Sequence, residues 1–178
     1  MNWPNRLTIL RVCLIPVCVW LMHVDSAVAR VLAPAVFIVA CLSDWLDGWL
    51  ARRQHIVTNF GKFLDPVADK LLVLSVLVAL CGLGRVPSWT CIVILFRELA
   101  VDGLRLIAVE QGRVIAAGPL GKLKTATQMC ALTAYLCGLD VVGWVLLLLA
   151  VALTVWSGVD YFIRNRGALT GGGKGEAA

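Results

Sequence analysis

Long apolar stretches alternate with short polar segments along the whole chain. A helix needs about 20 predominantly apolar residues to cross the hydrocarbon core of a bilayer, and six stretches approach that length. We therefore predict six transmembrane helices, whose short connections make neighbouring helices antiparallel. The expected spans are residues 5–23, 31–53, 66–84, 88–109, 121–138 and 141–162.

Composition supports a membrane protein of one domain. The chain of 178 residues is 60% hydrophobic and 15% charged, with a mean hydropathy of +0.87, which is far more apolar than a soluble globular domain. No linker or repeat divides it, so we predict a single all-α, polytopic integral membrane domain over residues 1–166. The Gly-rich tail, residues 167–178, can bury almost no apolar surface and is expected to be disordered. The seven cysteines form no C-x-x-C pair, which argues against a zinc site or a disulfide framework.

The distribution of cations predicts the orientation in the membrane. With six spans, only Arg30 and Arg85 of the 16 Lys and Arg residues fall on one side. Because cytoplasmic loops carry the excess of Lys and Arg, both termini and the second and fourth connections are expected to face the cytosol.

Four aspartates lie where the second and third predicted helices approach this cytosolic side. Asp44 and Asp47 are one turn apart, and Asp65 and Asp69 repeat the arrangement at i, i+4. Four converging carboxylates would repel one another unless a cation neutralised them. Oxygen ligands favour Mg²⁺ or Mn²⁺, and two such ions are the arrangement used for phosphoryl displacement. The acids alone fit a divalent-cation transporter and a metal-dependent enzyme equally well.

The residues around the acids favour the enzyme. Asp44-x-x-Asp47-Gly48-x-x-Ala51-Arg52, then eight residues, then Gly61-x-x-x-Asp65-x-x-x-Asp69, resembles without departure the signature of the CDP-alcohol phosphotransferase family. Gly48 and Ala51 would let a nucleotide approach the helix, Gly61 would relieve crowding where the two helices meet, and Arg52 offers a planar fork to phosphate oxygens. Without the full pattern, close helix packing would be the simpler explanation for Gly48 and Ala51.

The resemblance extends over most of the chain to the members of this family that use glycerol 3-phosphate. It is carried by residues 2–11, 42–53, 63–70, 97–98, 103–105 and 121–128. It implies a six-helix, homodimeric enzyme of the bacterial cytoplasmic membrane that transfers the phosphatidyl group of CDP-diacylglycerol to sn-glycerol 3-phosphate and releases CMP. No nucleic-acid partner is expected. Members that use inositol phosphate, serine or phosphatidylglycerol as the acceptor would share the signature, so they remain an alternative.

The resemblance also implies roles for single residues. Asp44, Asp47 and Asp65 would hold the metal ions, and Asp69 would be the general base, with metal binding as a second role. The CDP-diacylglycerol site would comprise Asn5, Thr8, Asp44, Gly48, Ala51, Arg52 and Gly61. For Asn5 and Thr8, plain helix capping is the competing interpretation.

The acceptor is a dianion, so its phosphate needs cations that face the same site. The candidates near the cytosolic ends of the fourth and fifth predicted helices are Arg97, Arg105, Lys122 and Lys124. The competing interpretation of Arg97 is a buried pair with Glu98 that only locks helices together. Asp102 is expected to form a salt bridge with Arg105 at i, i+3.

Overall fold

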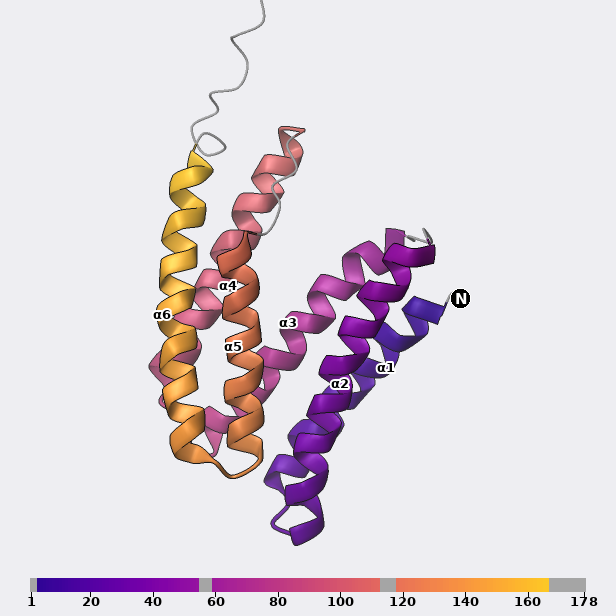
Figure 1. Ribbon diagram of the computed structural model, residues 1–178, viewed down its shortest axis with the longest axis vertical. Coiled ribbons are helices and arrows are strands. Elements are labelled where there is room, and N and C mark those ends of the chain that lie inside the picture. Colours follow the sequence, from indigo (N-terminus) through magenta and orange to yellow (C-terminus); the bar gives the residue numbers. More distant parts are fainter. Residues whose placement is uncertain (1–2, 55–58, 113–117, 167–178) are drawn as a thin grey trace, which may run out of the picture.

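The computed structural model describes residues 3–54, 59–112 and 118–166, and these residues form six α-helices and no strand (Figure 1). The helices are α1 (Trp3–His23), α2 (Ala27–Gln54), α3 (Asn59–Gly82), α4 (Ser88–Glu110), α5 (Pro119–Leu136) and α6 (Asp140–Arg164). The prediction of an all-α fold with six helices is therefore confirmed.

The largest departure from the predicted spans is at the start of α3. This helix begins at Asn59 rather than at residue 66, so Gly61 lies on helical backbone and not in a connection. Hydropathy locates the apolar part of a helix, but helical hydrogen bonds are internal to the segment and can continue past it. The first turns of α3 are the polar extension of an apolar helix.

The helices form two groups that α3 joins. Helices α5 and α6 pack as an antiparallel hairpin with α4 against α6, while α1 packs on both α2 and α3. Helix α3 also contacts α4 and α5, and α2 contacts α5. Figure 1 shows α3 running obliquely from beside the end of α2 toward the end of the α4, α5 and α6 group at which α4 begins.

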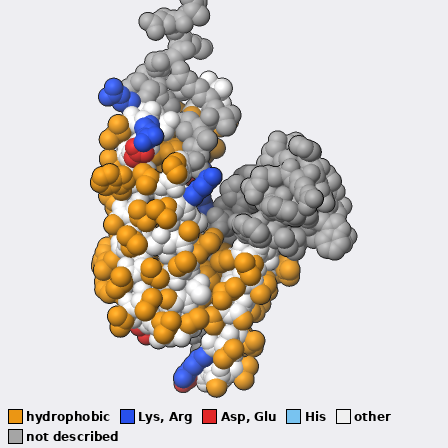
Figure 2. All heavy atoms as spheres, in the orientation of Figure 1, with side chains coloured by type: hydrophobic (Ala, Val, Ile, Leu, Met, Phe, Trp, Pro, Cys, Tyr) orange, Lys and Arg blue, Asp and Glu red, His pale blue; other side chains and the backbone are white. Residues whose placement is uncertain are grey.

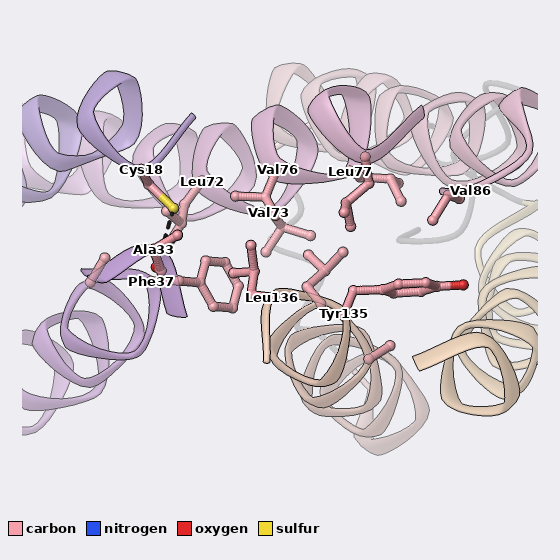
Figure 3. Packing of buried hydrophobic residues seen from close by; sticks show 14 of the residues in the cluster. Cys18, Ala33, Phe37, Leu72, Val73, Val76, Leu77, Val86, Tyr135 and Leu136 are labelled. Carbon is pink, nitrogen blue, oxygen red and sulfur yellow. Dashed lines mark hydrogen bonds between the residues drawn. The ribbon is translucent and has the colours of Figure 1, made fainter. Parts of the chain in front are cut away.

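The main core lies between these groups. Cys18 of α1, Phe37 of α2 and Leu72 of α3 are almost fully buried, as is Tyr135 of α5 (Figure 3). A smaller cluster, comprising Val101, Leu104, Ala108 and Tyr161, joins α4 to α6. Because both clusters contain residues from helices distant in sequence, they fix the relative positions of the helices.

The outward faces of the helices are strongly apolar. Hydrophobic side chains cover much of the face seen in Figure 2, and Phe96, Val141 and Trp156 are 73%, 79% and 70% exposed. By length and composition, α6 alone among the described residues qualifies as a membrane span. Shorter apolar segments run over residues 8–23, 27–43 and 70–82. The six membrane spans therefore remain a prediction.

An arginine at one end of the molecule ties the α3–α4 connection to α5 and α6. Arg85, in the α3–α4 connection, donates from Nε to Oδ1 of Asp140 at 3.1 Å and from Nη2 to the carbonyl oxygen of Tyr135 at 2.7 Å. Its guanidinium also lies 5.7 Å from the centroid of the Tyr135 ring. Gly143 of α6 leaves room for that ring, because a Cβ at Gly143 would lie 2.8 Å from Cδ2 of Tyr135.

Candidate functional site

The signature residues lie on the ends of α2 and α3 that flank their short connection. Helix α2 carries Asp44, Asp47, Gly48, Ala51 and Arg52, and α3 carries Gly61, Asp65 and Asp69. The two helices contact each other, as the sequence predicted for the aspartate-bearing pair. The side chains of these eight residues and of Asn5 lie outside the described residues, so their individual roles remain predictions.

The donor chemistry of the four aspartates fits a hard divalent ion. Asp44 and Asp47 come from α2, and Asp65 and Asp69 come from α3, so two contacting helices bring only carboxylate oxygens. Mg²⁺ and Mn²⁺ prefer such ligands. Among the side chains that the structure describes, no other group of three or more His, Cys, Asp or Glu residues could hold a metal ion.

Helix α1 buries two polar residues one turn apart. Thr8 and Arg11 are both 0% exposed, and α1 packs on the two helices that carry the aspartates. A fully buried guanidinium is costly unless it is paired, and Arg11 does have an interaction partner. In the predicted topology Arg11 is one of the cations on the cytosolic side, although its place in an apolar helix three residues after Thr8 is the signal of a buried role.

Side chains from three helices form a charge cluster that begins one residue after Asp69. It consists of Lys70 of α3, Arg97, Glu98 and Asp102 of α4, and Lys124 of α5. Oε1 of Glu98 accepts from Nη1 of Arg97 at 3.2 Å and also from Lys124. Oε2 of the same carboxylate lies 3.7 Å from Nζ of Lys70. One carboxylate thus contacts three cations.

Arg97 is enclosed by α4, α5 and α6. Its Nη2 donates to Oγ of Ser157 at 3.1 Å, and Nε is buried with no hydrogen-bond partner among the described residues. A Cβ at Gly158 would lie 3.1 Å from Cγ of Arg97, and one at Gly121 would lie 3.8 Å from Nη2. The contact between Arg97 and Glu98 is therefore present, as the competing interpretation expected. The guanidinium also retains hydrogen-bond donors that the described residues do not use.

The other three predicted acceptor cations differ in their surroundings. Nε of Arg105 donates to Oη of Tyr161 at 3.1 Å, and the guanidinium lies 5.6 Å from the centroid of that ring. Lys122 is exposed on α5, whereas Lys124 is 3% exposed and its ammonium group is bound to Glu98. The structure thus brings Arg97 and Lys124 together through Glu98, whereas Lys122 is exposed at the surface of α5.

The predicted salt bridge between Asp102 and Arg105 is wrong. Asp102 pairs with Lys70 of α3 instead, and Arg105 turns to Tyr161. In an apolar bundle, a cation on the facing helix is a better partner than one on the same helix, because its own burial also requires a counter-charge.

Sequence reasoning missed Lys70, Ser157 and Tyr161 as members of this region. Lys70 could have been found as an ionisable residue early in the apolar run of α3, next to Asp69. Ser157 and Tyr161 carry a weaker signal, since isolated polar groups on an apolar helix often bond to their own backbone.

Comparison with known proteins adds independent information. The sequence model of the CDP-alcohol phosphatidyltransferase family matches residues 1–156. The chain is 41% identical to the CDP-diacylglycerol–glycerol-3-phosphate 3-phosphatidyltransferase of Bacillus subtilis, over 94% of this chain and 97% of that protein. It is 40% identical to the protein of the same name from Rickettsia typhi, over 90% and 95% of the two chains. It is also 42% identical to a probable phosphatidylglycerophosphate synthase of Mycobacterium tuberculosis, over 92% of this chain and 81% of that protein.

Proposed function

The chain belongs to the CDP-alcohol phosphatidyltransferase family, and we propose that it transfers the phosphatidyl group of CDP-diacylglycerol to sn-glycerol 3-phosphate. The products are phosphatidylglycerophosphate and CMP, so the protein is a transferase of phospholipid biosynthesis. The observation that carries this function is the identity of about 40% to proteins named for this reaction, over nearly the whole of both chains. The complete aspartate signature on α2 and α3 agrees with it.

The reaction is a displacement at the β-phosphorus of CDP-diacylglycerol. Asp69 accepts the proton of the 1-hydroxyl group of glycerol 3-phosphate as that oxygen forms its bond to phosphorus, and the bond from phosphorus to the oxygen of CMP breaks. Asp44, Asp47 and Asp65 hold the divalent ions, with Asp69 as a further ligand. When bound, Mg²⁺ or Mn²⁺ neutralises the charge that develops on the departing phosphate.

The nucleotide side of the site comes from α1, α2 and α3. Arg52 binds phosphate oxygens of CDP-diacylglycerol, while Gly48, Ala51 and Gly61 keep the helix surfaces open for the nucleotide. Thr8 and Asn5 complete this side from α1. Support comes from the contacts that α1 makes with both other helices.

The acceptor side comes from α4 and α5. The phosphate of glycerol 3-phosphate is bound by Arg97, Arg105, Lys122 and Lys124, of which Arg97 has unused donors and is the most fixed by its surroundings. The charge cluster supports an anion site, since its three cations outnumber its two carboxylates. A dianionic acceptor supplies the missing negative charge.

The protein crosses the cytoplasmic membrane several times, with its termini and the aspartates toward the cytosol, and acts as a homodimer. The strongly apolar outer faces of the helices and the positions of the cations support the membrane orientation. A lipid substrate is then delivered from the bilayer, and a soluble acceptor comes from the cytosol. The homodimer follows from the family resemblance alone.

The function is tested with purified protein, CDP-diacylglycerol, Mg²⁺ or Mn²⁺ and a panel of acceptors, by measuring the release of CMP. We expect CMP with glycerol 3-phosphate, loss of activity when the metal is chelated, and recovery when either ion is returned. CMP released only with serine, inositol phosphate or phosphatidylglycerol would overturn the acceptor assignment. No CMP with any acceptor would overturn the enzyme.

A further inference from the structure

We propose that Glu98 is a positioning residue for the acceptor site, holding Arg97 and Lys124 in the arrangement that receives the phosphate of glycerol 3-phosphate. This role rests on the proposed function. A carboxylate cannot itself bind an anion, so Glu98 contributes to recognition of the phosphate through the cations that it holds.

The geometry of Glu98 sets it apart from an ordinary ion-pair partner. Its side chain is 11% exposed, and the side chains of Arg97 and Lys124 are 13% and 4% exposed, so the contacts are largely withdrawn from solvent. The same oxygen, Oε1, accepts from both cations. Arg97 and Lys124 come from α4 and α5, so Glu98 joins two helices at the point where the acceptor cations meet.

Arg97 has little freedom apart from this contact. Ser157 binds the Nη2 end of the guanidinium, and Gly158 lies against the aliphatic part of the side chain. Glu98 binds the Nη1 end. With both ends of the planar group held, the direction in which its remaining donors point is fixed, which is the condition for recognising a phosphate with defined geometry.

Removing the charge of Glu98 would leave Arg97 and Lys124 as like charges in a poorly solvated region. Two such cations repel one another and move apart or draw in water. The site would then have more positive charge but no fixed donor geometry. A purely electrostatic role and a positioning role therefore predict opposite changes in the affinity for glycerol 3-phosphate when Glu98 becomes neutral.

Glu98 is also linked to the helix that carries the proposed base. Its Oε2 lies 3.7 Å from Nζ of Lys70, and Lys70 directly follows Asp69 on α3. Asp102 binds the same lysine, so α3 is attached to α4 by two carboxylates. This attachment keeps the acceptor cations and the backbone at Asp69 in a constant relation, as a reaction between positioned groups requires.

The experiment compares Glu98→Gln with the wild-type enzyme in the full-length protein. Glutamine keeps the size and the hydrogen-bonding oxygen but removes the charge. Asp160→Asn is the matched control, because it removes one negative charge from an ion pair with Arg164 on α6 that is not part of the charge cluster. Steady-state release of CMP gives KM for each substrate and kcat. Thermal unfolding with and without glycerol 3-phosphate reports acceptor binding independently of turnover.

For Glu98→Gln, we expect KM for glycerol 3-phosphate to rise about tenfold while KM for CDP-diacylglycerol stays within about twofold of wild type. The thermal stabilisation by a fixed concentration of glycerol 3-phosphate should become smaller than in the wild type. For Asp160→Asn, both KM values should stay within about twofold of wild type. If Glu98→Gln does not fold, Glu98→Asp, which keeps the charge on a shorter side chain, is judged by the same selective rise.

An unchanged or lowered KM for glycerol 3-phosphate would overturn the positioning role, because neutralising Glu98 would then help or not affect the acceptor. Equal changes in both KM values would overturn it as well, in favour of a helix-locking role alone. A wild-type enzyme that releases no CMP with glycerol 3-phosphate would overturn the proposed function itself, and with it the basis of this assignment.

Discussion

Single residues of this protein show how a largely apolar bundle accommodates charge. As whole residues, Lys124 and Glu98 are only 3% and 8% exposed, and their side chains form an ion pair with each other. Arg11 is completely buried on α1 and also has a partner. An ionisable group inside such a bundle either pairs or serves a function. The sequence identifies such residues by their position in apolar runs but does not say which partner each will find.

In the proposed mechanism, the residue on which the chemistry depends most directly is Asp69. We expect Asp69→Asn to lower kcat by between about 10²- and 10⁴-fold, the range that a positioned general base contributes, because the amide cannot take the proton of the acceptor hydroxyl. Release of CMP at saturating concentrations of both substrates measures this.

Asp160→Asn is a suitable control for that measurement. Asp160 pairs with Arg164 at 2.7 Å on the outside of α6, so its loss should leave kcat unchanged. Comparable activity of Asp69→Asn and Asp160→Asn would remove Asp69 from the mechanism.

Among the elements, α3 has the most connections relevant to function. It carries Asp65 and Asp69 near its beginning, Lys70 in the charge cluster, and the core residues Leu72 and Leu77 farther along. It contacts α1, α2, α4 and α5. The helix therefore links the aspartate-bearing end of α2 to the helices of the proposed acceptor side.

The packing of α5 against α6 predicts a stability effect at Gly143. A Cβ there would lie 2.8 Å from the ring of Tyr135, and the ring is buried and held by Arg85. We expect Gly143→Ala to destabilise the protein by about 1–3 kcal/mol, the usual cost of overpacking. The temperature of unfolding of the purified protein in detergent measures this change.

Gly103→Ala on α4 is the matched control, since a Cβ at Gly103 meets no atom within 4 Å. Alanine has the higher helix propensity, so this variant should be as stable as the wild type or more stable by up to about 1 kcal/mol. Equal unfolding temperatures for the two variants would show that α6 can move away from Tyr135 without cost.

At the scale of the whole molecule, the six helices run alternately up and down. In Figure 1 the beginnings of α1 and α3 and the ends of α2, α4 and α6 lie toward one end of the molecule, while the α1–α2, α3–α4 and α5–α6 connections lie toward the other. Arg30 and Arg85, which the sequence assigned to the outer side, are both near this second end and are paired with Asp25 and Asp140. The arrangement agrees with the uneven distribution of the remaining cations.

Reporter fusions test the orientation that this arrangement predicts. A fluorescent protein fused after Arg166 should fluoresce, and alkaline phosphatase at the same place should be inactive, because that end is predicted to face the cytosol. A chain cut after Gly84 and fused to alkaline phosphatase should be active, because the α3–α4 connection is predicted to face outward. The same reporter result at both positions would contradict six spans.

The sequence by itself determined the family, the all-α class and the helices that carry the signature. The lengths of the apolar stretches and the spacing from Asp44 to Asp69 are local properties of the chain. Local properties can be recognised in the sequence before the tertiary structure is known. It also located helix ends within a few residues, except at α3, where Gly61, Lys62 and Asp65 interrupt the apolar residues of the first turns.

Only the tertiary structure decided which charges meet. Asp102 pairs with Lys70 rather than with Arg105, and one carboxylate, Glu98, gathers cations from three helices. These pairs join residues far apart in the sequence, and the choice among them depends on how α3, α4 and α5 cross. Burial sets the cost of leaving any one of them unpaired, and burial is a property of the assembled helices.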